Sequence, residues 1–128
     1  MKVCEFAPTM KVLGDNYEDR AVTLLEKRGL RLLERNFGGK TGEIDIIAQD
    51  RAELVFVEVR ARSNPFFEGA AASVNRRKQQ RIIRTAQLFL QSRPHYANMP
   101  CRFDVIAFEP PLSGTCPRIR WIRAAFTA

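Results

Sequence analysis

The chain has 128 residues, of which 45% are hydrophobic, and it carries a formal net charge of +7. This length fits a single domain with an ordinary core, and no stretch approaches the ~20 consecutive apolar residues that a membrane-spanning helix needs. We therefore expect no membrane partner.

The N-terminal segment and the cysteines indicate the compartment. Residues 1–13 are not typical of a signal peptide, because Glu5 and Pro8 interrupt any apolar run. We expect them to form a poorly ordered extension of a single domain that covers residues 14–128. An odd number of cysteines without metal-binding spacing predicts reduced thiols at Cys4, Cys101 and Cys116. A cytoplasmic protein is the prediction.

Hydrophobic periodicity and turn residues predict seven elements along the chain. The predicted helices cover residues 15–28 and 74–91. The predicted strands cover residues 30–37, 43–48, 54–61, 102–108 and 119–122. Helices and strands in this order predict an α/β or α+β domain, in which helices flank a central mixed sheet.

The second and third predicted strands form a hairpin if the chain turns at Arg51-Ala52. This register places Asp45 beside Glu58, and facing residues lie roughly 4.5–5.5 Å apart at Cβ. Two carboxylates at that separation repel each other unless a positive charge, such as a divalent cation, lies between them. Residues two apart on a strand share a face, so Glu43 joins Asp45 and Arg60 joins Glu58.

These residues suit phosphodiester hydrolysis, which needs a neutralised phosphate and an activated water. Mg²⁺ or Mn²⁺ held by carboxylates supplies both. Asp45 and Glu58 are the candidate ligands, together with Glu43 and the carbonyl of Val59, and Arg60 is the candidate phosphate-binding residue. Taken alone, the same pattern is more typical of a solvated hairpin face with Arg60 in a salt bridge.

Positive charge is concentrated after the hairpin. Residues 60–102 contain nine Lys or Arg side chains and one acid, Glu68. Such a segment predicts a polyanionic partner, and nucleic acid fits better than a membrane. A solvated basic surface, or a helix that docks an acidic protein, is the alternative. The candidate nucleic-acid-binding residues are Lys40, Arg62, Arg77, Lys78 and Arg81.

A set of motifs covers nearly everything after residue 13. The set comprises Glu18 with Ala21, Arg35-Asn36, Gly42-Glu43-Ile44-Asp45, Val55-Phe56-Val57-Glu58-Val59-Arg60-Ala61-Arg62, Lys78, and Arg102-Phe103-Asp104-Val105. In this order the motifs resemble the restriction-endonuclease-like, or PD-(D/E)xK, nuclease superfamily. More narrowly, the chain resembles the bacterial YraN family, which is similar in fold to archaeal Holliday-junction resolvases.

The resemblance implies a restriction-endonuclease-like fold and a Mg²⁺- or Mn²⁺-dependent endonuclease that acts on DNA, with branched DNA among the candidate substrates. Its catalytic positions fall on Glu18, Asp45, Glu58 and Arg60. Because two active sites must cut symmetric strands in a junction, the resemblance also implies a homodimer.

This chain departs from the superfamily pattern at two positions. Ile44 replaces a proline that is not a metal ligand. Arg60 replaces a lysine, and arginine stays charged and cannot act as a base. Lys40 or Lys78 could replace that lysine in space. The alternative is a catalytically weak or inactive nucleic-acid-binding module that keeps the nuclease fold.

Overall fold

The structure is a computed structural model, and it describes residues 13–40, 42–61 and 74–128. Its helices are α1 (Leu13–Lys27), α2 (Arg76–Ser92) and the short 3-10 helix η3 (Pro94–Tyr96). Its strands are β1 (Arg31–Gly39), β2 (Gly42–Asp50), β3 (Glu53–Ala61), β4 (Cys101–Glu109) and β5 (Arg118–Phe126).

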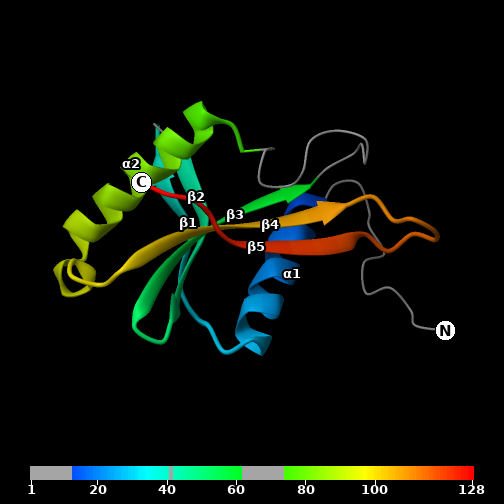
Figure 1. Cartoon of the computed structure of the whole chain (residues 1–128), viewed down its shortest axis with the longest axis horizontal. Helices are drawn as coiled ribbons and strands as arrows, with labels where there is room; N and C mark the ends of the chain where they lie inside the picture. Colours follow the sequence, from blue (N-terminus) through cyan, green and yellow to red (C-terminus); the bar gives the residue numbers. More distant parts are fainter. Residues whose placement is uncertain (1–12, 41, 62–73) are drawn as a thin grey trace.

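The five strands form one sheet in the order β1-β2-β3-β4-β5. The β3–β4 pair is parallel and the other three pairs are antiparallel, so α2 is the helix in the crossover between β3 and β4 (Figure 1). The predicted mixed sheet in an α+β domain is thereby confirmed. Within the described ranges, no helix is long and apolar enough to cross a membrane.

The seven predicted helices and strands are all present, but three details differ from the predictions. β5 continues to Phe126, because its pairing with β4 resumes at Phe103 after an irregularity. Leu13 belongs to α1, while residues 1–12 of the predicted extension lie outside the described residues. Cys101 is a free thiol but Cys116 is disulfide-bonded, so the prediction of reduced thiols is wrong for Cys116.

The two long helices cover opposite faces of the sheet (Figure 1). Alternate strand residues point to opposite faces, so each strand supplies two cores. The core under α1 contains Ala21, Leu25, Ile46, Val57, Ile106 and Phe108. The core under α2 contains Ile47, Phe56, Ile82, Phe89, Phe103 and Val105.

The β2–β3 hairpin has the predicted register. Ile46 pairs with Val57 and Asp50 pairs with Glu53, which leaves Arg51-Ala52 as a two-residue turn. Arg51 adopts a φ of 58°, which such a tight hairpin turn requires. Continued by one residue, the same register sets Asp45 beside Glu58.

A partly buried ion cluster lies at the turn end of the β2–β3 hairpin. Arg102 contacts Asp50 at 3.0 Å, Glu53 at 2.8 Å and Asp104 at 3.1 Å. Burial opposes the charge of Arg102, but hydrogen bonds to these carboxylates outweigh burial and raise its pKa. Asp104 is fully buried and also accepts hydrogen bonds from Trp121 Nε1 and the Ala124 N–H. The cluster therefore joins β2, β3, β4 and β5.

Asp104→Ala should lower the free energy of unfolding by about 3–5 kcal/mol, because it removes the fully buried acceptor of two partly buried hydrogen bonds and one partner of the Arg102 ion pair. Urea unfolding at neutral pH measures this loss. Asp19→Ala is the matched control, since Asp19 forms an exposed ion pair with Arg35, and such pairs contribute about 0–1 kcal/mol. Equal losses in the two variants would contradict a structural role for Asp104.

Candidate functional site

Asp45 and Glu58 lie where β2 begins and β3 ends. The N–H of Val59 donates a hydrogen bond to Asp45 Oδ2 at 2.8 Å, which ties the Asp45 carboxylate to β3. Glu58 is 4% exposed, an unusual burial for a carboxylate. The β2–β3 hairpin has therefore brought two carboxyl groups together at its end away from the turn.

The pKa of Asp45 shows how strongly these groups interact. It rises to about 7 because burial disfavours the charged form and because the Glu58 carboxylate repels it. The hydrogen bond from Val59 acts in the opposite direction, while a hydrogen bond between the two carboxyl groups and the charge of Glu18 raise the pKa further. Near neutral pH this part of the site consequently favours an added positive charge, from a proton or a cation.

Two cations already contact Glu58. Lys78 Nζ from α2 lies 3.2 Å from Glu58 Oε2, and Arg60 Nη1 from β3 lies 3.6 Å from the same oxygen. The side chains of Lys78 and Arg60 remain 39% and 35% exposed, so solvent and ligands can reach them. Lys78 thus places an ammonium group beside the glutamate, although it comes from a helix rather than from β3.

Glu18 is held from β1. Its Oε1 accepts hydrogen bonds from Arg35 Nε at 3.0 Å and Asn36 Nδ2 at 3.1 Å. Asn36 has a φ of 54°, in the left-handed region that asparagine tolerates better than most residues. The β1–β2 register, with Arg35 opposite Ile46, places Asn36 opposite Asp45. Asn36 therefore connects the helix-borne acid to the strand that carries Asp45.

Sequence reasoning missed the role of Arg35 and Asn36. Both belonged to the motif set, but neither received a function, because their contacts depend on how α1 packs against β1. The available signal was Asn36, since asparagine is depleted in strands.

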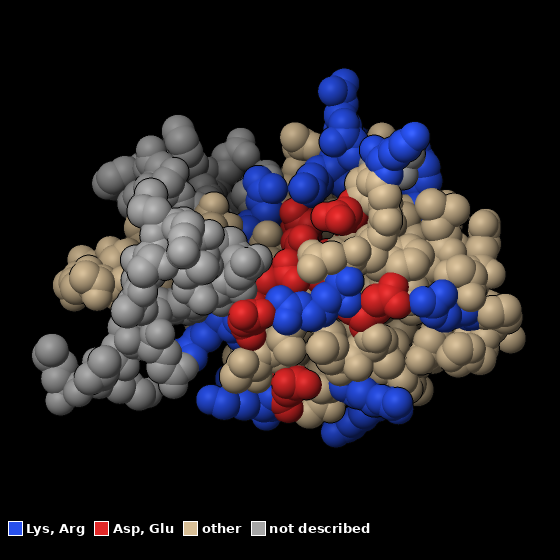
Figure 2. Space-filling view, turned by 180° about the vertical axis from the view of Figure 1, so that it is seen from behind, with Lys and Arg blue, Asp and Glu red and all other residues tan. Residues whose placement is uncertain are grey.

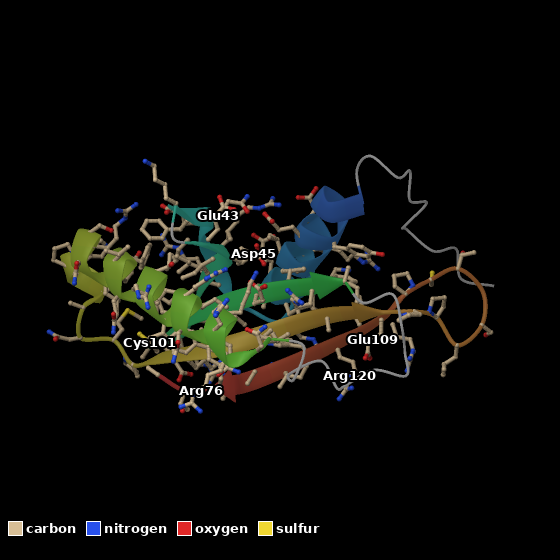
Figure 3. The ribbon with its side chains drawn as sticks, turned by 90° about the horizontal axis from the view of Figure 1, so that it is seen from above. Glu43, Asp45, Arg76, Cys101, Glu109 and Arg120 are labelled. Carbon is tan, nitrogen blue, oxygen red and sulfur yellow. The ribbon has the colours of Figure 1, made fainter. Side chains whose placement is uncertain are left out.

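The other predicted site residues lie around this centre or outside the described residues. Glu43 is exposed on β2, and no hydrogen bond or ion pair within the described ranges joins it to Asp45 or Glu58 (Figure 3). Ile44 packs under α2 whereas Ile46 packs under α1, so the strict alternation expected to align Glu43 with Asp45 is interrupted. Arg62 lies outside the described residues.

Three of the basic candidates are exposed on elements next to those that carry Asp45 and Glu58. Lys40 is exposed after β1, and Arg77 and Arg81 are exposed on α2. A Cβ at Gly42 would lie 3.6 Å from Arg81 Cβ, so Arg81 lies close to the start of β2. On the face seen in Figure 2, acidic side chains form a central band with Lys and Arg side chains above, below and beside it.

The donor set fits a weakly held hard cation better than a closed metal cage. No group of three or more His, Cys, Asp or Glu side chains in the described ranges is placed to hold a metal ion. Asp45 and Glu58 supply two carboxylates, and Mg²⁺ commonly binds through one or two carboxylates with water and substrate phosphate as its other ligands. These two residues are the ones that would hold Mg²⁺ or Mn²⁺.

Fold and site together define a mixed α+β domain with a buried carboxylate pair beside accessible cations. The chain belongs to the Uncharacterised protein family UPF0102, which matches residues 17–108. The matched segment contains Glu18, Asp45, Glu58, Arg60 and Lys78.

Similar proteins occur in several bacteria. A UPF0102 protein of Stutzerimonas stutzeri is 47% identical over 113 residues, which cover 88% of this chain and 92% of the relative. One from Janthinobacterium sp. is 47% identical over 118 residues, covering 92% of this chain and 89% of the relative. One from Xanthomonas oryzae is 46% identical over 115 residues, covering 90% and 91%.

Asp45→Asn should stabilise the fold at alkaline pH, because the amide resembles the protonated carboxyl group. The folded-state pKa of about 7 lies above the ordinary 3.8, so the wild type loses stability as pH rises between these values. Allowing for partial solvent exposure, we expect Asp45→Asn to gain about 1–3 kcal/mol at pH 8 and almost nothing near pH 4.

Urea unfolding of both proteins at the two pH values measures this difference. Glu43→Gln is the matched control, since it removes an exposed carboxylate from the same strand. A gain that is the same at both pH values, or a loss at pH 8, would contradict the raised pKa.

Proposed function

We propose that this chain is a Mg²⁺- or Mn²⁺-dependent endonuclease-like protein that binds DNA and hydrolyses phosphodiester bonds. One observation carries the proposal. The carboxylates of Asp45 and Glu58 adjoin at one border of the sheet, and the accessible cations Lys78 and Arg60 contact Glu58. Such a constellation offers negative charge to a metal and positive charge to a phosphate within one small area.

Each side chain has a defined task in this proposal. A divalent ion bound there would polarise a phosphoryl oxygen and lower the pKa of a bound water. Asp45 and Glu58 would hold the ion, and the Val59 N–H orients the Asp45 carboxylate. Arg60 and Lys78 bind the non-bridging oxygens of the phosphate, where charge accumulates during the reaction.

Glu18 contributes through its position beside Asp45. Arg35 and Asn36 fix one of its oxygens, and its charge reaches Asp45 strongly enough to raise that residue's pKa. In the proposed site it orients water next to the metal ligands. Arg35 and Asn36 are therefore positioning residues.

The architecture supports assignment to the restriction-endonuclease-like fold. Supporting features are the mixed sheet, one long helix on each face, and acids on α1, β2 and β3. The resemblance to the YraN family and to junction resolvases supports DNA as substrate, branched DNA included. We extend the proposal to a cytoplasmic homodimer, the form in which two sites can cut symmetric strands.

Lys78 could replace the lysine that the superfamily has at the position of Arg60. The superfamily pattern has a lysine two residues after the glutamate, where this chain has an arginine. Lys78 brings an ammonium group to the same glutamate from the first turn of α2, where Asn75 caps the helix through the Lys78 N–H. We propose that Lys78 supplies the lysine function and that Arg60 adds a permanent charge for the phosphate.

A second candidate is a nucleic-acid-binding module without efficient catalysis. It is favoured by the ion pairs themselves, because Arg60 and Lys78 already neutralise Glu58 and thus reduce its need for a metal. This candidate predicts salt-sensitive DNA binding that survives metal chelation, together with no turnover. It also predicts that Arg60→Lys creates or sharply increases cleavage.

Purified protein with Mn²⁺ should cleave at least one of four fluorescent DNA substrates: a four-way junction, a flap, a duplex and a single strand. Asp45→Ala and Glu58→Ala should each lower the cleavage rate by at least about 100-fold, because each removes a carboxylate that holds the metal. Cleavage by the wild type that does not exceed that of these variants would falsify the nuclease proposal. DNA binding without cleavage would favour the binding module.

Lys78→Ala should lower the cleavage rate at saturating DNA by about 10²–10³-fold, the usual effect of removing a group that stabilises transition-state charge. Arg77→Ala is the matched control, because Arg77 is the preceding residue on α2 and is exposed. We expect this variant to weaken DNA binding while leaving the rate at saturation within about threefold. Equal effects on the rate would show that Lys78 contributes only general charge.

A further inference from the structure

A row of side chains leads from the candidate site across the sheet to its β5 edge. Arg60 on β3 pairs with Ala107 on β4, and Ala107 pairs with Arg120 on β5. Side chains that are direct neighbours across strands point to the same face of a sheet. Arg60 and Arg120 therefore flank a small residue on one face.

The neighbouring row identifies that face. Glu58 pairs with Val105, and Val105 pairs with Ile122. Val105 and Ile122 both pack in the core under α2. Because residues two apart share a face, Arg60 and Arg120 lie on the same side as Glu58 and Lys78.

We propose that Arg120 is a second phosphate-binding position, which contacts the backbone of the same nucleic acid strand whose phosphate lies at Arg60. This inference rests on the proposed function and defines the path of the substrate beyond the candidate site. Figure 3 shows Asp45 on β2 and Arg120 on the edge strand β5, with β3 and β4 between these two strands. The strand thus crosses β4 toward β5.

The spacing of the two arginines suits a nucleic acid backbone. Adjacent strands lie ~4.8 Å apart, so residues two strands apart are separated by roughly 10 Å. Each strand of B-DNA rises ~3.4 Å per nucleotide. Because successive phosphates also rotate about the helix axis, they lie farther apart than this rise, and Arg60 and Arg120 are consequently spaced for phosphates about one to two nucleotides apart.

Arg120 is available for such a contact. Its side chain is 54% exposed, and its Nε lies 3.8 Å from Glu109 Oε1. At this distance and exposure the ion pair is weak, but it restricts where the side chain lies. The contact with Glu109 uses Nε. Neither Nη group of Arg120 contacts an acceptor among the described residues, so both can donate hydrogen bonds to a phosphate.

The other arginines of β5 are placed differently. Arg118 Nε donates to the Pro110 carbonyl at 3.1 Å. The guanidinium of Arg123 lies 4.2 Å from the centre of the Trp121 ring, and Trp121 packs against the core under α1. Arg123 therefore lies on the opposite face of the sheet from Arg120, which makes it a control of equal charge on the same strand.

The test measures the affinity of a short fluorescein-labelled DNA duplex by fluorescence anisotropy, with EDTA present to prevent cleavage. Kd is determined at several salt concentrations between about 50 and 200 mM KCl. We expect Arg120→Gln to raise Kd about five- to twentyfold at the lower salt and to reduce the slope of log Kd against log salt by about 1, the loss of one phosphate contact. Arg120→Lys should retain the wild-type slope, and Arg123→Gln should retain both slope and affinity.

Thermal melting followed by circular dichroism verifies that each variant is folded. If the wild type binds and Arg120→Gln leaves the slope unchanged, this inference is overturned while the proposed function stands. An equal loss of affinity in Arg120→Gln and Arg123→Gln also overturns it, because binding would then depend on total charge. If the wild type does not bind the duplex even at the lowest salt, the DNA-binding part of the proposed function fails, and this inference fails with it.

Discussion

Burial of the Asp45 and Glu58 carboxylates against each other is the interaction on which the candidate site depends. Two like charges at this separation destabilise the folded state unless protons or cations offset their repulsion. The structure offsets part of it with the Val59 N–H and with Lys78 and Arg60. Burial and the remaining repulsion together raise the pKa of Asp45 to about 7. A binding partner that adds positive charge here would stabilise the fold as it binds.

The rest of the domain supplies the rigidity that keeps these groups together. The site takes side chains from α1, β1, β2, β3 and α2, so its geometry depends on both cores at once. The α1 core fixes the distance from Glu18 to the sheet, and the α2 core fixes where Lys78 reaches Glu58. A cavity in either core would therefore disturb the site even without touching it, because packed interiors transmit small shifts.

Local regularity determined what the sequence could predict. Asp45 and Glu58 could be paired because strand alternation and a two-residue turn at Arg51-Ala52 fix a hairpin register by counting. Counting residues along the strands could not predict the role of Asn36, because this role depends on a positive φ and on how α1 packs against β1. The placement of Glu43 relied on alternation that is interrupted beside Asp45, where Ile44 and Ile46 enter different cores.

The sequence could not predict the position of Lys78 or the extent of β5, because both depend on tertiary packing. Lys78 was one of two lysines that could have approached the site, and only the packing of α2 on the sheet decides between them. The extent of β5 also depends on tertiary pairing. Ala124 and Ala125 are weak strand formers, and the strand continues past them because Phe126 pairs with Phe103 on β4. Arg120 lies in the regularly paired part of β5, and Arg123 lies at the irregularity that precedes this extension.

The ion cluster around Arg102 and the ion pairs of Glu58 differ in how far their cations are exposed to solvent. Arg102 contacts three carboxylates through Nη1 and Nε and is only 13% exposed, so its charge is neutralised inside the protein, although its buried Nη2 has no hydrogen-bond partner within the described ranges. Lys78 and Arg60 keep more than a third of their surface in water while they contact a glutamate that is 4% exposed. A cluster built only for stability gains little from cations that remain open to solvent, because water weakens their attraction for the buried charge. In the proposed function, this exposure lets Lys78 and Arg60 exchange the glutamate for a phosphate.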